Sequence, residues 1–377
     1  MFAGTPPMGF NTWNTFGGNI SAQLLCETAD AMVEKGYRDA GYEYVVLDDG
    51  WMLPERGKDG RLVPNPKTFP DGMKAVADYI HSKGLKFGIY SCAGVRTCMG
   101  LPSSYGHEFE DARTFAEWGV DFLKYDFCNF PKTGNCRLAY HTMSMALKAS
   151  GRRILFSACN WGVEAPWDWM RSIGVHMYRS TGDILDNFES FKDIAMSQFP
   201  NLSSNAPGCF NDMDMLVVGM YGNGNVGDKD NVMTDEEYRM HFAWWCLFGT
   251  PLMIGGDIRK LDGFCRDLLL NPELIAIDQD EECRDPVLVG NAGGNRPVYL
   301  RHMADGSFVI GMFNLCDYRA GTLFIFADAG LPVSSGIGLD LTDIFTGEKL
   351  GVKQDYFMPS LPPHTCKLYR AKFAPIK

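Results

Sequence analysis

Acidic, basic and aromatic residues recur at the ends of short apolar runs along this chain. Asp48 and Asp49 directly follow the run 44–47, and Lys124 and Asp126 close the run that begins at Phe122. Carboxylates can act as nucleophile, general acid or general base, and they accept hydrogen bonds from hydroxyl groups. Combined with aromatic rings, which pack on apolar faces, such a set favours the binding and cleavage of a sugar. The run-end residues are Trp13, Asp48, Asp49, Tyr90, Lys124, Asp126, Asn160, Trp161, Arg179, Asp183, Asp212 and Asp214.

Simpler interpretations exist for single members of this set. An Asp at a strand end commonly caps the next turn or helix, although this explains one position better than several at once. Asp48 and Asp49 side by side could bind Mg²⁺, but the seven His residues show no spacing typical of a metal site. Lys124 could form a Schiff base, but an anion as close as Asp126 would keep its amine protonated and therefore non-nucleophilic.

If the run-end residues form one site, the fold must bring them together, and the hydrophobic pattern predicts such a fold. From residue 8 to about 255, β-rich runs alternate with amphipathic stretches such as 24–32 and 73–80, which are followed by Gly36 and Gly84 as helix ends often are. Eight such units predict an α/β fold, the (β/α)8 TIM barrel, whose active site lies at the carboxyl ends of its strands. The strands are expected to end near Trp13, Asp48, Tyr90, Asp126, Cys159, Arg179, Asp214 and Ile254.

A different pattern begins after Pro286. The run Pro297–His302, the turn 304–306 and the run Phe308–Asn314 form a hairpin signature, and 340–345 and 365–369 add further strands. These runs have no helices between them. We therefore predict two domains, a catalytic barrel over 1–286 and an antiparallel β-sandwich over 287–377.

The overall charge and composition exclude several kinds of partner. The formal net charge of -11 offers no basic surface for nucleic acid, and the apolar runs are too short to span a bilayer. The first residues lack the basic and apolar stretches of a secretory signal, which predicts a cytoplasmic location, or a secreted one if a signal has been removed. The twelve cysteines contain no C-x-x-C pair, so neither a zinc site nor a dense disulfide framework is indicated.

Seven segments, in order and across essentially the whole chain, resemble glycoside hydrolase family 27, the family of α-galactosidases and α-N-acetylgalactosaminidases. The match is specific because it includes most of the run-end residues above. The segments are 8–14 (MGFNTWN), 47–51 (LDDGW), 88–90 (GIY), 124–128 (KYDFC), 178–184 (YRSTGDI), 211–216 (NDMDML) and 271–280 (NPELIAIDQD).

The resemblance implies a retaining exo-glycosidase that uses no metal or organic cofactor. Asp126 matches the family's nucleophile and Asp183 its acid/base, and retention needs these two carboxyl groups about 5–5.5 Å apart. Lys124, two residues before Asp126, should lie on the same face of the strand and keep Asp126 ionised. Asp183, by contrast, has to carry a proton in the first step.

The same matches imply a shell of residues around a terminal galactose. Asp48 and Asp49 would accept hydrogen bonds from the 4- and 6-hydroxyls, and Lys124 would reach the 3- and 4-hydroxyls. Arg179 and Asp214 would lie near the 2-position. Trp13, Tyr90 and Met215 would form walls, and Cys98 and Cys128 match a cysteine pair that bridges two loops at the mouth in relatives.

The loop after the fifth strand departs from the family pattern. It reads Cys159-Asn160-Trp161, with Asn160 where galactosidases usually have Glu or Gln. Because this loop reads the substituent at C2, Asn160 and the nearby Val163 favour galactose over N-acetylgalactosamine. Asp49, shorter than Glu, leaves room for the galactose hydroxymethyl group and argues against a β-L-arabinopyranosidase.

Three alternatives remain open from the sequence alone. The first is an α-N-acetylgalactosaminidase on the same barrel, and the second is a catalytically silent galactose-binding barrel, against which the retained Asp126 and Asp183 argue. The third concerns assembly, because a homo-oligomer joined through the C-terminal domain is as compatible with the sequence as a monomer. The expected partner is a terminal α-galactoside, either an oligosaccharide or a glycoconjugate, and the loops 51–70 and 219–235 are expected to choose its leaving group.

Overall fold

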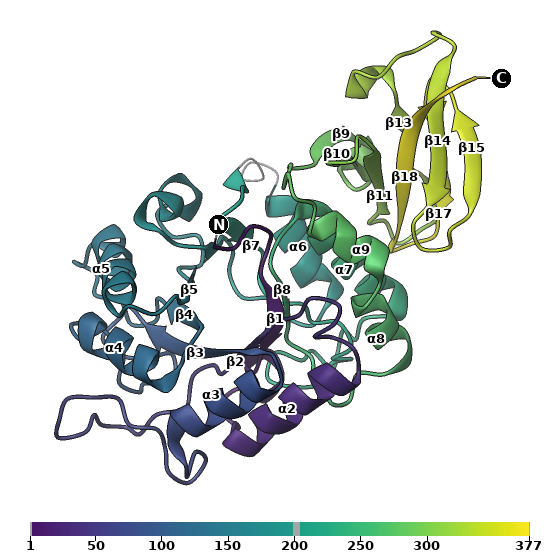
Figure 1. The fold of residues 1–377 in the computed structure, drawn as a ribbon. Helices are drawn as coiled ribbons and strands as arrows, with labels where there is room; N and C mark the ends of the chain where they lie inside the picture. Colours follow the sequence, from purple (N-terminus) through teal and green to yellow (C-terminus); the bar gives the residue numbers. More distant parts are fainter. Residues whose placement is uncertain (1, 199–203, 377) are drawn as a thin grey trace.

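The structure, a computed structural model, describes residues 2–198 and 204–376. Its larger part is one curled sheet of eight parallel strands in the spatial order β7-β6-β5-β4-β3-β2-β1-β8 (Figure 1). β1 pairs with β8, and a parallel bridge between Leu216 and Ile254 closes the ring on the other side of β8. The strands are β1 (Met8–Asn11), β2 (Tyr44–Val46), β3 (Lys86–Cys92), β4 (Phe122–Asp126), β5 (Leu155–Ala158), β6 (Met177–Arg179), β7 (Phe210–Asp212) and β8 (Leu252–Ile254).

Helices connect most of these strands and surround the barrel. Side-chain caps mark the starts of several of them. Ser21 accepts a hydrogen bond from the Leu24 N–H at the start of α2, and Thr234 and Glu237 form a capping box at the start of α7. The fifth connection has two short 3₁₀ turns over residues 166–173 instead. The helices are α1 (Trp13–Phe16), α2 (Ala22–Glu34), α3 (Gly72–Ser82), α4 (Glu108–Trp118), α5 (Cys136–Ala149), α6 (Phe188–Ser197), α7 (Asp235–Phe248), α8 (Gly263–Leu269) and α9 (Pro272–Asp278).

The predicted TIM barrel is confirmed, and each predicted strand end lies within two residues of the observed one. Inward-pointing side chains fill the lower part of the barrel, so it is a packed core with its functional residues above it. That interior cluster consists of Tyr44, Val46, Phe122, Leu155, Met177, Met215 and Met253.

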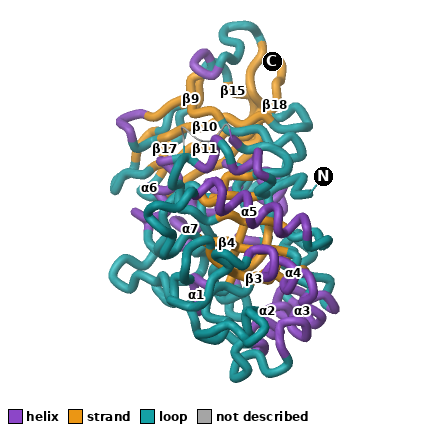
Figure 2. The backbone as a smooth tube through the Cα atoms, turned by 90° about the vertical axis from the view of Figure 1, so that its left-hand side faces the viewer, coloured by secondary structure: helices purple, strands orange, loops and turns teal. Residues whose placement is uncertain are grey.

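The C-terminal part forms an antiparallel sheet of order β15-β14-β18-β11-β10-β9, on which two short ribbons, β12-β17 and β13-β16, pack. Figure 2 shows these strands gathered at one end of the molecule. β9 begins at residue 287, and the boundary at 286 stays a prediction. The strands are β9 (Val287–Asn291), β10 (Pro297–His302), β11 (Phe308–Asn314), β12 (Ala320–Gly321), β13 (Phe324–Ile325), β14 (Ile337–Asp343), β15 (Lys349–Lys353), β16 (Tyr356–Phe357), β17 (Ser360–Leu361) and β18 (Thr365–Pro375).

The two parts share a buried contact around the end of α7. Trp244 stacks on Phe313 of β11 with ring centroids 4.4 Å apart. Arg301 of β10 is buried and donates from Nη1 to the carbonyl oxygens of Cys246 and Leu247, both at 3.0 Å. These carbonyls carry the partial negative charge of a helix C-terminus, which the guanidinium neutralises.

We expect the protein to lose stability as pH rises, because of Asp285 in this contact. Burial raises the pKa of Asp285 to about 7, although the Arg301 charge acts in the opposite direction. The unfolded chain releases this proton near pH 4 and the folded chain keeps it until about pH 7, so the free energy of unfolding should fall between those values, by roughly 2–4 kcal/mol. Asp285→Asn should remove that part of the pH dependence.

Thermal unfolding between pH 4.5 and 8 checks this expectation. The Asn variant should match the wild type at low pH and be more stable at pH 8. Asp328→Asn, a change at an exposed carboxylate of the C-terminal domain, is the control and should leave the profile unchanged. Parallel profiles for wild type and Asp285→Asn would contradict the expectation.

Candidate active site

The carboxyl ends of the barrel strands surround one pocket of about 220 Å³. Every predicted site residue except Asn160 lines it. Four further residues line it that the sequence reasoning did not single out, namely Asn14, Ile184, Leu185 and Val226. The predicted residues in the pocket are Trp13, Asp48, Asp49, Tyr90, Cys98, Lys124, Asp126, Cys128, Trp161, Arg179, Asp183, Asp214 and Met215.

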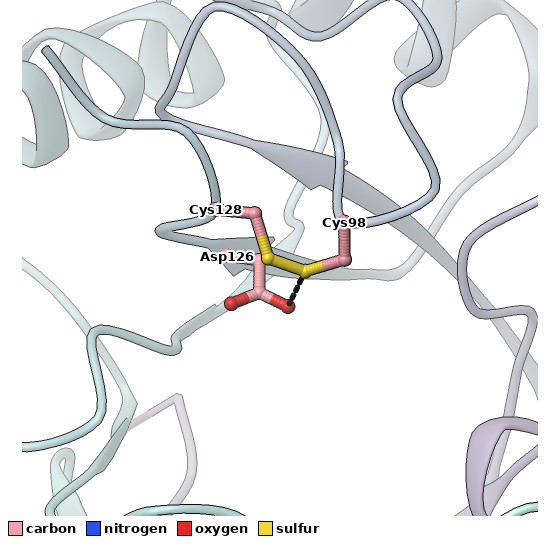
Figure 3. A group of neighbouring side chains, drawn as sticks. All are labelled: Cys98, Asp126 and Cys128. Carbon is pink, nitrogen blue, oxygen red and sulfur yellow. Dashed lines mark hydrogen bonds between the residues drawn. A yellow bond between two sulfur atoms is a disulfide. The ribbon is translucent and has the colours of Figure 1, made fainter.

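Asp126 is the last residue of β4 and its side chain is buried. Oδ1 accepts a hydrogen bond from the Phe127 N–H at 2.8 Å, and Oδ2 lies 3.6 Å from the Cys98 sulfur (Figure 3). Burial raises the pKa of Asp126, and the Lys124 charge and the Phe127 N–H only partly offset this. Lys124 thus acts on the pKa of Asp126 in the expected direction, but burial has the larger effect.

Lys124 lies two residues earlier on the same strand and forms an ion pair with Asp48, Nζ to Oδ2 at 2.8 Å. Asn11 Nδ2 donates to the same oxygen at 2.7 Å. Burial alone would lower the pKa of Lys124, but the charge of Asp48 reverses this and holds it above its ordinary value. A lysine that stays protonated cannot attack a carbonyl carbon, which disfavours the Schiff-base interpretation.

Asp49 is held by two backbone donors. Oδ1 accepts from the Gly50 N–H at 2.7 Å, and Oδ2 accepts from the Met99 N–H at 2.8 Å, which ties the loop after β3 to the end of β2. Burial raises the pKa of Asp49 to about 6. Because the neighbouring Asp48 is already paired with the Lys124 ammonium, this pair offers sugar hydroxyls oriented acceptors rather than a cation site.

Arg179 of β6 joins two carboxylates, with Nη2 2.5 Å from Asp183 Oδ1 and 2.8 Å from Asp214 Oδ2. Asp214 is fixed further by the N–H groups of Ile184 and Met215, at 2.8 and 2.7 Å. The Asp183 side chain is 67% exposed, whereas that of Arg179 is 4% exposed. Asp183 can therefore exchange protons with solvent while its position is set by a buried guanidinium.

Cys98 and Cys128 are joined by a disulfide with their Cα atoms 5.1 Å apart (Figure 3). The bond links the loop after β3 to the loop after β4, and the Tyr90 hydroxyl donates to the Cys98 sulfur at 3.5 Å. Cys98, Cys128 and Asp126 bring three potential metal-ligand atoms within 4.8 Å of one another, and among the described residues they form the one such group. Two sulfurs bonded to each other are not thiolates, so this group forms a pocket wall instead.

The structure does not bring Asn160 into the pocket, which corrects the prediction that its side chain lines the site. Its side chain is buried, and Nδ2 donates to the Val163 carbonyl oxygen at 2.6 Å and faces the Cys136 sulfur of α5 at 3.8 Å. The reason is the backbone of Trp161, whose φ of +55° turns the loop so that the Trp161 side chain, and not that of Asn160, enters the pocket.

The four pocket residues that the sequence did not indicate lie on segments that pair with one another. Ile184 and Leu185 directly follow Asp183, and Val226 joins them because Asp186 and Gly227 form a parallel bridge that lays the two loops side by side. The Asn225 and Val226 N–H groups donate to the Asn14 carbonyl oxygen at 2.8 and 3.1 Å. Because these segments are far apart in sequence, only the tertiary structure shows that they form one wall of the pocket. The sequence analysis did include Val226 in the loop 219–235 that was expected to choose the leaving group.

Comparison with known proteins decides the family. Residues 5–280 match the sequence model of a family described as "Alpha galactosidase A", and residues 293–371 match that of the "Alpha galactosidase C-terminal beta sandwich domain". The chain belongs to the α-galactosidase family.

Individual relatives agree with this family. An α-galactosidase from Cyamopsis tetragonoloba is 42% identical over 367 residues, which cover 97% of this chain and 85% of that protein. One from Coffea arabica is 44% identical over 335 residues, which cover 87% and 84%. The solved structure of α-galactosidase I from Mortierella vinacea has a TM-score of 0.91 at 33% identity, and the match covers 98% of this chain and 97% of that one. As a member of the α-galactosidase family, this chain is a glycoside hydrolase.

Proposed function

We propose that this protein is a retaining exo-α-galactosidase with Asp126 as nucleophile and Asp183 as acid/base. The observation that supports this best is the contrast between two carboxylates in one pocket. Asp126 is buried at the end of β4, whereas Asp183 is exposed to solvent and held by Arg179. A nucleophile benefits from a site without water, and a group that donates and then accepts a proton needs access to it.

In the first step, Asp126 Oδ2 attacks the anomeric carbon while Asp183 gives its proton to the departing glycosidic oxygen. Oδ2 is the free oxygen, because Oδ1 already accepts the Phe127 N–H. In the second step, Asp183 takes a proton from water, and the resulting hydroxide displaces Asp126 from the sugar. Two inversions at the same carbon give net retention.

The other pocket residues would bind the galactose ring. Asp48, Asp49 and Lys124 offer two acceptors and a donor at one end, where the 3-, 4- and 6-hydroxyls are proposed to lie. A pocket of about 220 Å³ suits one small ligand rather than an extended chain, which supports removal of terminal residues.

Proton NMR of an aryl α-galactoside digest tests the proposal, since it identifies the released sugar and its first-formed anomer together. Release of β-galactose first would contradict retention.

The rival substrate is an α-N-acetylgalactosaminide. Because Asn160 lies outside the pocket, the preference for galactose now rests on the α-galactosidase relatives and on the large Trp161 side chain in the pocket. Paired assays with the two aryl glycosides separate the alternatives. Faster turnover of the N-acetylgalactosaminide would overturn the proposed substrate.

We propose that Leu185 contacts the leaving group. It follows Asp183 by two residues, lines the pocket and is 48% exposed, whereas none of the residues 51–70 lines the pocket. Leu185→Ala should lower kcat/KM for an aryl α-galactoside about 3- to 10-fold, the effect of losing part of a buried leucine contact. The hydrolysis of the galactosyl-enzyme should be unchanged, because the leaving group has gone by then.

Pre-steady-state kinetics measures both steps of the Leu185 variant. Leu138→Ala is the control, since Leu138 is 60% exposed on α5 and does not line the pocket. An equal loss in both steps, or none in the first, would contradict the role of Leu185.

The location of the protein remains a prediction. In the described residues, none of the helices combines the length and the apolar character that a bilayer crossing requires. The Cys98–Cys128 disulfide weighs against the predicted cytoplasmic location, because disulfides rarely persist in a reducing compartment. A count of reactive thiols in protein from its native source tests it, with twelve expected for the cytoplasm and ten for an oxidising compartment.

A further inference from the structure

A second, smaller chamber lies inside the barrel next to the galactose pocket. Lys124, Arg179, Asp214 and Met215 line both spaces and therefore form the partition between them. Three apolar side chains of the barrel strands line the chamber and not the pocket: Phe122, Met177 and Met253. The other residues that line it are Asn11, Ser157, Cys159 and Asp212.

The chamber has about 20 Å³ of space for the centre of a water-sized molecule. One water needs roughly 10–15 Å³ by this measure, together with two to four polar partners. The chamber is thus large enough for a single water and too small for a sugar hydroxymethyl group with its hydration.

Polar groups with unused hydrogen-bonding capacity meet at this chamber. The buried Arg179 Nε–H has no partner among the residues that the structure describes. Asp212 Oδ1 accepts the Asp214 N–H at 2.8 Å, which leaves Oδ2 as a further acceptor. Ser157 contributes a hydroxyl that can donate or accept. Strand register places Asp212 beside Arg179. Ser157 lies between Lys124 of β4 and Met177 of β6, two residues below the level of Arg179, and lines the same chamber.

We propose that the chamber is a hydration site, in which one ordered water accepts from the Arg179 Nε–H and donates to Asp212, with Ser157 as its third partner. Ser157 and Asp212 are then positioning residues that act through Arg179. The functional consequence rests on the proposed roles of Asp126 and Asp183, but the presence of the water does not.

The reason why this water matters is the geometry of the guanidinium. Nη2 holds both Asp183 and Asp214, so a small rotation of the Arg179 plane moves the acid/base. A third fixed contact at Nε resists that rotation. Burial raises the pKa of Asp212 to about 6, so near neutral pH this carboxylate is mostly ionised and can balance the Arg179 charge through the water.

Two substitutions of Ser157 separate the effect of losing the water from the effect of losing the hydroxyl. Ser157→Val replaces the hydroxyl by two methyl groups and should fill the chamber, whereas Ser157→Ala removes the hydroxyl and keeps the space. A crystal structure at a resolution that shows ordered waters should contain the chamber water in the wild type and in Ser157→Ala, and not in Ser157→Val.

Kinetics then distinguishes positioning from a general structural role. If Arg179 shifts, Asp183 protonates the leaving group less well, so Ser157→Val should lower kcat/KM about tenfold for a poor leaving group such as methanol and less than threefold for dinitrophenol. Ser157→Ala should be within threefold of the wild type for both. Asp212→Asn, which keeps the shape of the side chain, should follow Ser157→Val in its dependence on the leaving group and serves as the second variant if Ser157→Val does not fold.

Wild-type electron density without a water bonded to Arg179 Nε would overturn the hydration site. An equal loss for both leaving groups in Ser157→Val, or in Asp212→Asn if the first variant fails to fold, would overturn the positioning role. A wild-type protein that hydrolyses neither galactoside would instead refute the proposed function, and the density would still decide on the water.

Discussion

Asp126→Asn is expected to lower kcat/KM for an aryl α-galactoside by at least about 10⁴-fold, because an amide cannot form the galactosyl ester on which the reaction depends. The substitution keeps the size of the side chain, and its oxygen can still accept the Phe127 N–H that now binds Oδ1. The pocket should therefore keep its shape. The loss should fall on kcat rather than on KM, since the groups proposed to hold the sugar are unchanged.

Single-turnover kinetics and intact-protein mass spectrometry test this expectation together. A 2-deoxy-2-fluorogalactoside with an activated leaving group should add one sugar to the wild type and none to the variant, and peptide mapping should place the sugar on Asp126. Asp193→Asn on α6, whose side chain is 76% exposed, is the matched control and should behave as wild type. Near-normal turnover of Asp126→Asn would end the assignment of the nucleophile.

The sequence predicted the barrel because its signals were local and repeated. The turn 304–306 between two apolar runs likewise predicted β10 and β11 to the residue. Strands of two residues, such as β12 and β13, were missed, because no periodicity can be read over so short a length. The fifth barrel unit was expected to contain a helix, but the segment around Pro166 forms 3₁₀ turns, which only backbone coordinates reveal.

The candidate site could be predicted from strand ends where the side chains there point inward, toward the barrel axis. Asp126 and Arg179, which end their strands, were placed correctly for that reason. Asn160 lies in a loop whose direction depends on a single positive φ at Trp161, and spacing along the chain contains no information about it. The pKa of Asp126 depends on burial by residues from several strands, so the sequence could name the neighbouring Lys124 but not weigh it against desolvation.

Asp183→Ala is the second change with a large expected effect, and its size should depend on the leaving group. Substrates with a poor leaving group need a proton from Asp183, so we expect their kcat/KM to fall about 10²- to 10⁴-fold. Substrates such as dinitrophenyl galactoside leave without protonation and should lose far less in the first step. Their galactosyl-enzyme should then accumulate, because no base activates water for the second step.

Added azide distinguishes this role from every other way of losing activity. Azide needs no general base, and Asp183→Ala opens space at an exposed position beside the anomeric carbon. Azide should restore turnover of the dinitrophenyl substrate by the variant and yield α-galactosyl azide, the product of a second inversion. Asp230→Ala, at an exposed carboxylate on the loop that contains Val226, should show neither the loss nor the rescue. If azide instead produced the β-azide, Asp183 would be acting as the nucleophile, and the two proposed roles would have to be exchanged.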